Sequence, residues 1–186
     1  MNKLLSFAKI AGICLLLPLL FQVILLFSHS YNHFLVALDL LIGLIPNVLW
    51  IIFFSFLIKA SVKSSPVIAP SYVAIVAFGI ALIANFLFPL LSELTKGWDG
   101  ELGIASNVLN LLVYPIVVAV AFIWLSKFFQ KGSTLKITCI VIALVALINI
   151  IFTLLFRNWT VVVIGISVSL IAQIVFFFAF SKINNQ

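Results

Sequence analysis

The chain has 186 residues, of which 66% are hydrophobic and only 8% are charged. A soluble domain is usually about half apolar and about a quarter charged, so this composition excludes a soluble fold and requires lipid around the chain. The net charge of +6 does not indicate nucleic-acid binding, because the lysines stand singly at segment ends and form no clustered basic patch.

Six apolar segments follow one another along the chain, and each has about the 20 residues that a helix needs to cross a bilayer. They are residues 4–27, 34–58, 72–94, 108–128, 137–156 and 160–181. The separators are short, so consecutive helices should be antiparallel neighbours, and no separator is long enough to form a second domain. We predict an all-α integral membrane protein, with one domain of six transmembrane helices in an antiparallel bundle.

Basic residues are distributed unequally between the two sets of segment ends. The richer set carries eight of them: Lys3, Lys9, Lys59, Lys63, Lys127, Lys131, Lys136 and Lys182. The opposite set carries only Lys96 and Arg157. Because lysine and arginine are enriched in cytoplasmic loops, both termini should face the cytoplasm. We expect a multi-pass protein of a bacterial cytoplasmic membrane, with the central loop outside.

Short fragments recur in the segments and suggest three helical hairpins of common design. LPLLFQ (17–22), FPLLSE (88–93) and FTLLFR (152–157) fall in the odd-numbered segments. FSFLIK (54–59), FIWLSK (122–127) and FFAFSK (177–182) end the even-numbered ones. Chance similarity is the alternative, because a chain so rich in Leu, Ile and Phe produces such matches easily.

Polar residues inside the segments are informative, because lipid cannot satisfy a polar group. Each segment carries one carboxamide: Gln22, Asn47, Asn85, Asn110, Asn149 and Gln173. Gln22, Asn85 and Asn149 each lie thirteen positions from a residue at the cytoplasmic boundary, or about 20 Å into the bilayer. The candidate outward-facing polar pocket consists of Gln22, Asp39, Asn85, Asn110 and Asn149. The alternative is that these side chains only hydrogen-bond neighbouring helices together.

Asp39 is the acidic residue that lies well inside a segment, and helical spacing puts it on one face with Gly43, Pro46 and Trp50. Gly43 should let another helix approach closely, so that Asp39 meets a partner. Asp39 is then either a proton or cation site or a structural or interfacial residue bonded to a neighbour's Asn, Ser or Tyr. Prolines inside four segments (Pro18, Pro46, Pro89 and Pro115) should kink their helices, each freeing the carbonyl four residues earlier.

The central separator, residues 95–107, is the largest extracytoplasmic loop. It holds Trp98, Asp99 and Glu101 together with three glycines. These residues form either a solvated turn with an interfacial tryptophan or a contact surface for another protein. We take Trp98, Asp99 and Glu101 as the candidate outer contact loop.

Catalytic and metal-binding motifs are missing from the sequence, so we expect no enzyme, no cofactor and no metal site. Two functions fit what is left. The first is a non-enzymatic protein that acts through contacts with another membrane protein, as an accessory, assembly or immunity-like subunit. The second is a small-molecule transporter or substrate-binding membrane module that uses the polar pocket and the kinked helices. The lipid bilayer is the partner common to both, and nucleic acid is a partner of neither.

Overall fold

A computed structural model describes residues 2–27, 33–62, 64–88, 91, 104–106, 108–156 and 159–183. In chain order the principal elements are α1 (Asn2–Cys14), α2 (Leu16–Phe27), α3 (His33–Ala60), α4 (Ile68–Leu82), η1 (Ile83–Leu87), η2 (Leu109–Val113), α7 (Tyr114–Ser126), α8 (Thr134–Phe156) and α9 (Trp159–Ser181). The described chain is helical and contains no strand. Six helical stretches in it are long and apolar enough to cross a membrane, which confirms that part of the predicted fold.

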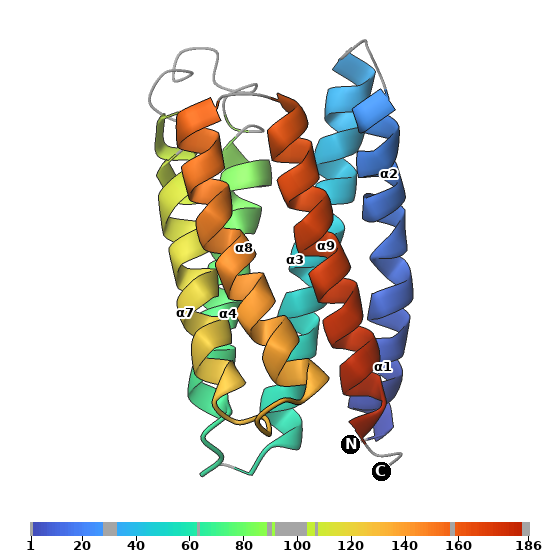
Figure 1. Cartoon of the computed structure of the whole chain (residues 1–186), viewed down its shortest axis with the longest axis vertical. Coiled ribbons are helices and arrows are strands. Elements are labelled where there is room, and N and C mark those ends of the chain that lie inside the picture. Colours follow the sequence, from blue (N-terminus) through green and yellow to red (C-terminus); the bar gives the residue numbers. More distant parts are fainter. Residues whose placement is uncertain are drawn as a thin grey trace.

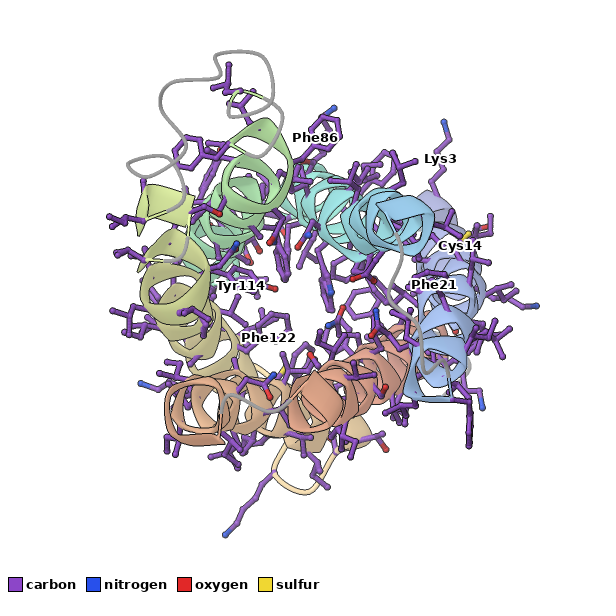
Figure 2. All side chains as sticks on the ribbon, turned by 90° about the horizontal axis from the view of Figure 1, so that it is seen from above. Lys3, Cys14, Phe21, Phe86, Tyr114 and Phe122 are labelled. Atoms are coloured by element: carbon purple, nitrogen blue, oxygen red, sulfur yellow. The ribbon has the colours of Figure 1, made fainter. Side chains whose placement is uncertain are left out.

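The six stretches stand side by side, and the chain runs up and down through them (Figure 1). They are α1–α2, α3, α4–η1, η2–α7, α8 and α9. Each stretch contacts the next one along the chain, and α9 returns to contact α1 and α2. Seen along its axis, the molecule is therefore a closed ring of helices (Figure 2). Both termini lie at one end, which we call the termini end; the other is the opposite end.

The outer surface of the ring carries many exposed apolar side chains. Leu20, Ile24 and Ile151 are more than half exposed on this outer surface. Such a surface is costly in water and suited to hydrocarbon. Among the described lysines, Lys3, Lys59 and Lys182 lie at the termini end, at or beside the ends of α1, α3 and α9. Figure 2 shows Lys3 outside the ring, whereas Tyr114 lies on its inner side.

Prolines and carboxamides mark the irregular points of the helices. The first stretch breaks at Leu15, three residues before Pro18, whose ring cannot supply the backbone bond of a regular helix. Pro46 lies inside the continuous helix α3. Pro115 follows the π-helical turn η2, in which the Tyr114 N–H donates to the carbonyl of Leu109. Wide turns of this kind inside α-helices are frequent at functional sites.

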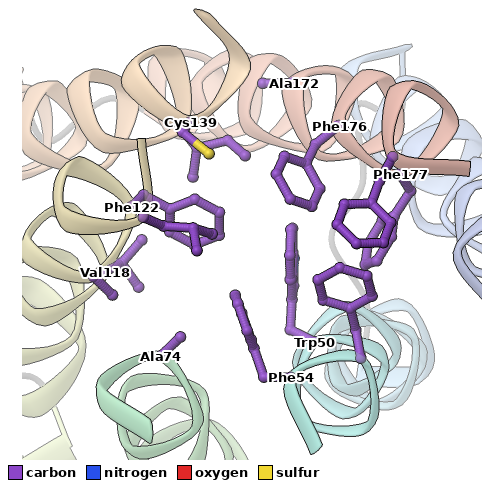
Figure 3. Close-up of a cluster of buried hydrophobic side chains, with 14 of the residues drawn as sticks. Trp50, Phe54, Ala74, Val118, Phe122, Cys139, Ala172, Phe176 and Phe177 are labelled. Carbon is purple, nitrogen blue, oxygen red and sulfur yellow. The ribbon is translucent and has the colours of Figure 1, made fainter. Parts of the chain in front are cut away.

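A cluster of aromatic rings lies inside the ring of helices (Figure 3), on the side toward the ends of α3 and α9 at the termini end. Trp50 is fully buried, and six phenylalanine rings of the described chain have centroids 4.4–5.7 Å from its ring. They are Phe53, Phe54, Phe78, Phe122, Phe176 and Phe177. Most of these pairs meet edge to face or tilted, and each such pair adds about 0.5–1.5 kcal/mol beyond its buried area. The aromatic cluster, Trp50 with these phenylalanines, occupies the interior of the ring on this side.

Close helix approach occurs at glycines other than the one predicted. The expectation that Gly43 lets another helix come near is wrong, since no atom lies within 4 Å of the place where its Cβ would be. Gly43 borders a cavity instead. The close approaches are at Gly12, whose Cβ would lie 3.3 Å from the Phe178 ring, and at Gly165, whose Cβ would overlap the carboxamide of Asn149.

Candidate functional site

A polar cavity of about 280 Å³ lies inside the ring of helices, and all six helical stretches contribute to its wall. It is lined by Pro18, Gln22, Asp39, Gly43, Pro46, Asn47, Asn85, Tyr114, Asn149, Ile166, Ser169, Leu170 and Gln173. A smaller cavity of about 130 Å³ adjoins it and shares Tyr114, Asn149, Ser169 and Gln173 with it. We call these the main cavity and the side cavity.

The two cavities collect every carboxamide of the six segments. Gln22, Asn47, Asn85, Asn149 and Gln173 line the main cavity, and Asn110 lines the side cavity. All five members of the predicted polar pocket therefore border one cavity or the other, Asp39 included. That they bind a ligand stays a prediction, because the same side chains also hydrogen-bond one another across the helices.

Asp39 on α3 meets Gln22 on α2, a glutamine in place of the Asn, Ser or Tyr that was predicted as its structural partner. The Gln22 Nε2 donates to the Asp39 Oδ1 at 3.0 Å. Gln22 is only 6% exposed, and its Oε1 is buried and accepts no hydrogen bond from any described residue. The carboxamide nitrogen can only donate and Asp39 Oδ1 accepts from it, so the nitrogen of Gln22 is the end that faces Asp39.

The two π-helical turns lie on neighbouring helical stretches and meet through their asparagines. Asn85 lies in η1 and Asn110 in η2, and the Asn110 Nδ2 donates to the Asn85 Oδ1 at 2.7 Å. Asn110 Oδ1 is buried without a partner among the described residues. Ser106 adds a second link, since its hydroxyl donates to the Ala84 carbonyl at 2.8 Å. The widened turns thus hold the two helices together where they border the cavities.

Trp50 joins the main cavity to the aromatic cluster. Its indole Nε1 donates to the Gln173 Oε1 at 2.7 Å, and the Gln173 Nε2 donates to the Ser169 Oγ at 3.1 Å. Both Trp50 and Gln173 are buried, at 0% and 7% exposure. Their polar atoms are satisfied by each other, as buried groups require. Gln173 and Ser169 therefore line the side of the main cavity that faces the aromatic cluster, and a hydrogen bond joins Gln173 to Trp50 in that cluster.

Asn149 approaches the backbone of α9 at Gly165, where a methyl group would overlap its carboxamide. The absence of a side chain at Gly165 thus lets Asn149 stand between α8 and α9 while it lines both cavities. This close packing sets the position of a polar group that belongs to both cavities.

Sequence reasoning missed Asn47, Tyr114, Ser169 and Gln173 as cavity residues. A signal was present for Asn47, which lies twelve positions from Lys59 and hence at nearly the same depth as the three carboxamides measured from the cytoplasmic boundary. Gln173 is only nine positions from Lys182, so it lies closer to the termini end than the other carboxamides do, beside the aromatic cluster. Trp98, Asp99 and Glu101, the candidate outer contact loop, lie outside the described residues, as does Pro89.

The chemistry of the site is that of neutral hydrogen-bonding groups around one carboxyl side chain. Lining residues of the two cavities in the described chain include no Lys, Arg, His or Cys, and no group of three or more metal-ligating side chains occurs among the residues that the structure describes. The arrangement suits binding and orienting a small polar molecule. Comparison of the chain with protein-family models, curated proteins and solved structures finds no match.

Proposed function

We propose that this chain is a multi-pass integral membrane protein that binds a small polar molecule in the main cavity and moves it across, or presents it within, the membrane. The observation that carries the proposal is the main cavity itself, to which all six helical stretches contribute. Its volume of about 280 Å³ is close to the lower end of the range for small-molecule pockets, roughly 300–1,000 Å³. Interrupted helices around a polar site are the means by which transporters hold substrates.

The proposed orientation places the termini end in the cytoplasm. Lysines gather at that end, and basic residues mark cytoplasmic loops. The main cavity then faces the outer side and the aromatic cluster faces the cytoplasm. A reporter that is active only outside should work when it is fused after Gly100 and fail when it is fused after Gly132. The opposite pattern would reverse the orientation.

Ligand-induced stabilisation of the detergent-purified protein tests the binding function. A library of small polar molecules is screened, and native mass spectrometry identifies any molecule that co-purifies. A ligand at 100 times its Kd should stabilise the folded state by about 2.7 kcal/mol. The double variant Asp39→Asn with Asn85→Leu should fold and lose this effect. Ser167→Ala is the control, because that hydroxyl bonds to its own helix at the Val163 carbonyl. A double variant that keeps full binding refutes the proposed site.

The accessory-subunit function predicted from the sequence remains a separate proposal. It depends on Trp98, Asp99 and Glu101 as the contact loop for another membrane protein. Replacing residues 95–107 with a short Gly-Ser turn should then remove that partner from a crosslinking pull-down. An unchanged set of crosslinked proteins would argue against it.

A further inference from the structure

We infer that the molecule bound in the main cavity is a small polyol, which pairs its hydroxyl groups with the carboxamides of the wall and extends into the side cavity. The inference rests on the proposed function and adds the chemical class of the ligand. Two acceptor atoms are buried without a donor among the described residues, the Gln22 Oε1 and the Asn110 Oδ1. Gln22 lines the main cavity and Asn110 lines the side cavity, so one such oxygen belongs to each of the two adjoining cavities.

The two oxygens require a ligand that donates hydrogen bonds. Leaving an acceptor buried without a donor is unfavourable, and a ligand that supplies an O–H or N–H group removes this penalty. The nitrogens of both carboxamides are already engaged: the Gln22 Nε2 donates to the Asp39 Oδ1 at 3.0 Å, and the Asn110 Nδ2 donates to the Asn85 Oδ1 at 2.7 Å. The last torsion of a Gln or Asn side chain turns easily. A small turn of each carboxamide therefore presents its oxygen to the cavity that it lines.

A hydroxyl group matches both ends of a carboxamide. A carboxamide nitrogen carries two hydrogens, and the nitrogens of Gln22, Asn110 and Gln173 each donate to a single acceptor among the described residues. A hydroxyl donates one hydrogen bond and accepts others, whereas an ammonium group only donates and a carboxylate only accepts. Every helical stretch contributes one carboxamide to the two cavities. The ligand therefore needs several hydroxyl groups on a short skeleton, and this is the composition of a polyol.

The apolar part of the wall fits the carbon skeleton of such a molecule. A single water takes about 30 Å³, so a cavity of about 280 Å³ has room for a short chain of carbon atoms with their hydroxyl groups. Pro18, Pro46 and Leu170 supply apolar surface in the main cavity. Phe78 and Val118 supply it in the side cavity. The C–H groups of a polyol can lie against these side chains while its hydroxyl groups meet the carboxamides.

Comparison of matched ligands tests the class on the unmodified full-length protein. Glycerol, xylitol and mannitol are measured by calorimetry in detergent. The polyol that binds best is then compared with its 1-deoxy analogue, which keeps the carbon skeleton and lacks one terminal hydroxyl. We expect the analogue to bind about 5-fold to 150-fold more weakly, because one buried oxygen then stays without a donor. Equal binding of the two, the result expected if ordered waters alone satisfy the oxygens, overturns the polyol inference and leaves the proposed function standing. A protein that binds other small molecules and no polyol has the same meaning.

Variants then assign the two ends of the ligand. Gln22→Met removes the oxygen in the main cavity, and Asn110→Leu removes the one in the side cavity. In either variant the single terminal hydroxyl of the 1-deoxy analogue can pair with the oxygen that is left, so the polyol and its analogue should bind equally well. Ser167→Ala should keep the discrimination of the wild type, because that hydroxyl bonds within its own helix to the Val163 carbonyl. Unchanged discrimination in well-folded Gln22→Met and Asn110→Leu proteins overturns the inference. If no small molecule of any class stabilises or binds the wild-type protein, the proposed function itself fails.

Discussion

Trp50 and Gln173 connect the polar and the aromatic halves of the interior through one hydrogen bond of 2.7 Å. Both side chains are buried, and each satisfies a polar atom of the other. The indole also stacks among the phenylalanines with its ring faces and edges, and this holds its N–H in the direction of Gln173. Gln173 lines the main cavity and Trp50 is at the centre of the aromatic packing, so this one hydrogen bond connects the two.

Replacing Trp50 with phenylalanine should destabilise the protein by about 1–3 kcal/mol, because Gln173 Oε1 would be buried without a donor. The change keeps an aromatic ring in the cluster, so the lost hydrogen bond dominates the effect. Unfolding in mixed detergent, followed by tryptophan fluorescence and helicity, measures it. Trp124→Phe is the matched control, since Trp124 is 39% exposed on α7 and should cost little. Equal destabilisation by the two variants would contradict the role given to the hydrogen bond.

Gly165→Ala should disturb the site without removing a polar group. The added methyl overlaps the Asn149 carboxamide, so either Asn149 turns away or α9 separates from α8. Overpacking of this kind costs about 1–3 kcal/mol, and ligand binding should weaken with it. Gly79→Ala is the control, because no atom lies within 4 Å of the new methyl. Thermal unfolding of both variants, with and without ligand, measures the loss of stability and of ligand binding. A Gly165→Ala protein as stable as the wild type would show that the contact between Gly165 and Asn149 is not tight.

At the scale of the helices, sequence patterns located the apolar stretches well, because hydrophobic length alone determines them. The leading phenylalanines of the three even-numbered fragments are Phe54, Phe122 and Phe177, and all three are buried against Trp50. The residues four positions earlier include Trp50 and Gln173, which bond to each other. This convergence is what a threefold design of hairpins would produce, although the triplication itself stays a prediction.

Other features of the helices could not be derived from the sequence. The wide turns η1 and η2 depend on how each helix fits its neighbours, and no residue pattern specifies them uniquely. Gly43 was misjudged for the same reason: a glycine permits a close approach, but the neighbouring helix decides whether one occurs. Depth along a helix was predictable at 1.5 Å per residue, whereas the rotation of each helix about its axis was not.

The two wide turns should be energetically coupled through Asn85 and Asn110. In a double-mutant cycle of Asn85→Ala and Asn110→Ala, the interaction energy should be about 0.6 kcal/mol, and at most about 1.7 kcal/mol, as for other hydrogen bonds between membrane helices. Unfolding free energies of the wild type, the two single variants and the double variant give this value. Asn110→Ala combined with Ser55→Ala should be additive, because the Ser55 hydroxyl bonds within its own helix to Ile51. Complete additivity for Asn85 and Asn110 would mean that their 2.7 Å bond contributes nothing.

At the scale of the whole molecule, the described residues form a ring of six apolar helices around an interior with two parts. Aromatic rings occupy the interior on the termini side of the centre, and farther along the carboxamides and Asp39 border the main cavity. Composition predicted the apolar exterior, and the spacing of carboxamides predicted that polar groups lie at similar depths. The closed ring was beyond sequence reasoning, because the contact of α9 with α1 and α2 joins the two ends of the chain.

This asymmetry predicts access to the cavity from one side of the membrane only. In a background with Cys14→Ala and Cys139→Ala, Ser169→Cys places a thiol in the wall of both cavities. A membrane-impermeant maleimide should label it from the outside, whereas the aromatic cluster should block the reagent from the cytoplasmic side. Gln130→Cys, in the exposed turn between α7 and α8, should show the reverse. Labelling of Ser169→Cys only from the cytoplasm would invert the proposed orientation, and equal labelling from both sides would mean that the aromatic cluster does not seal the ring.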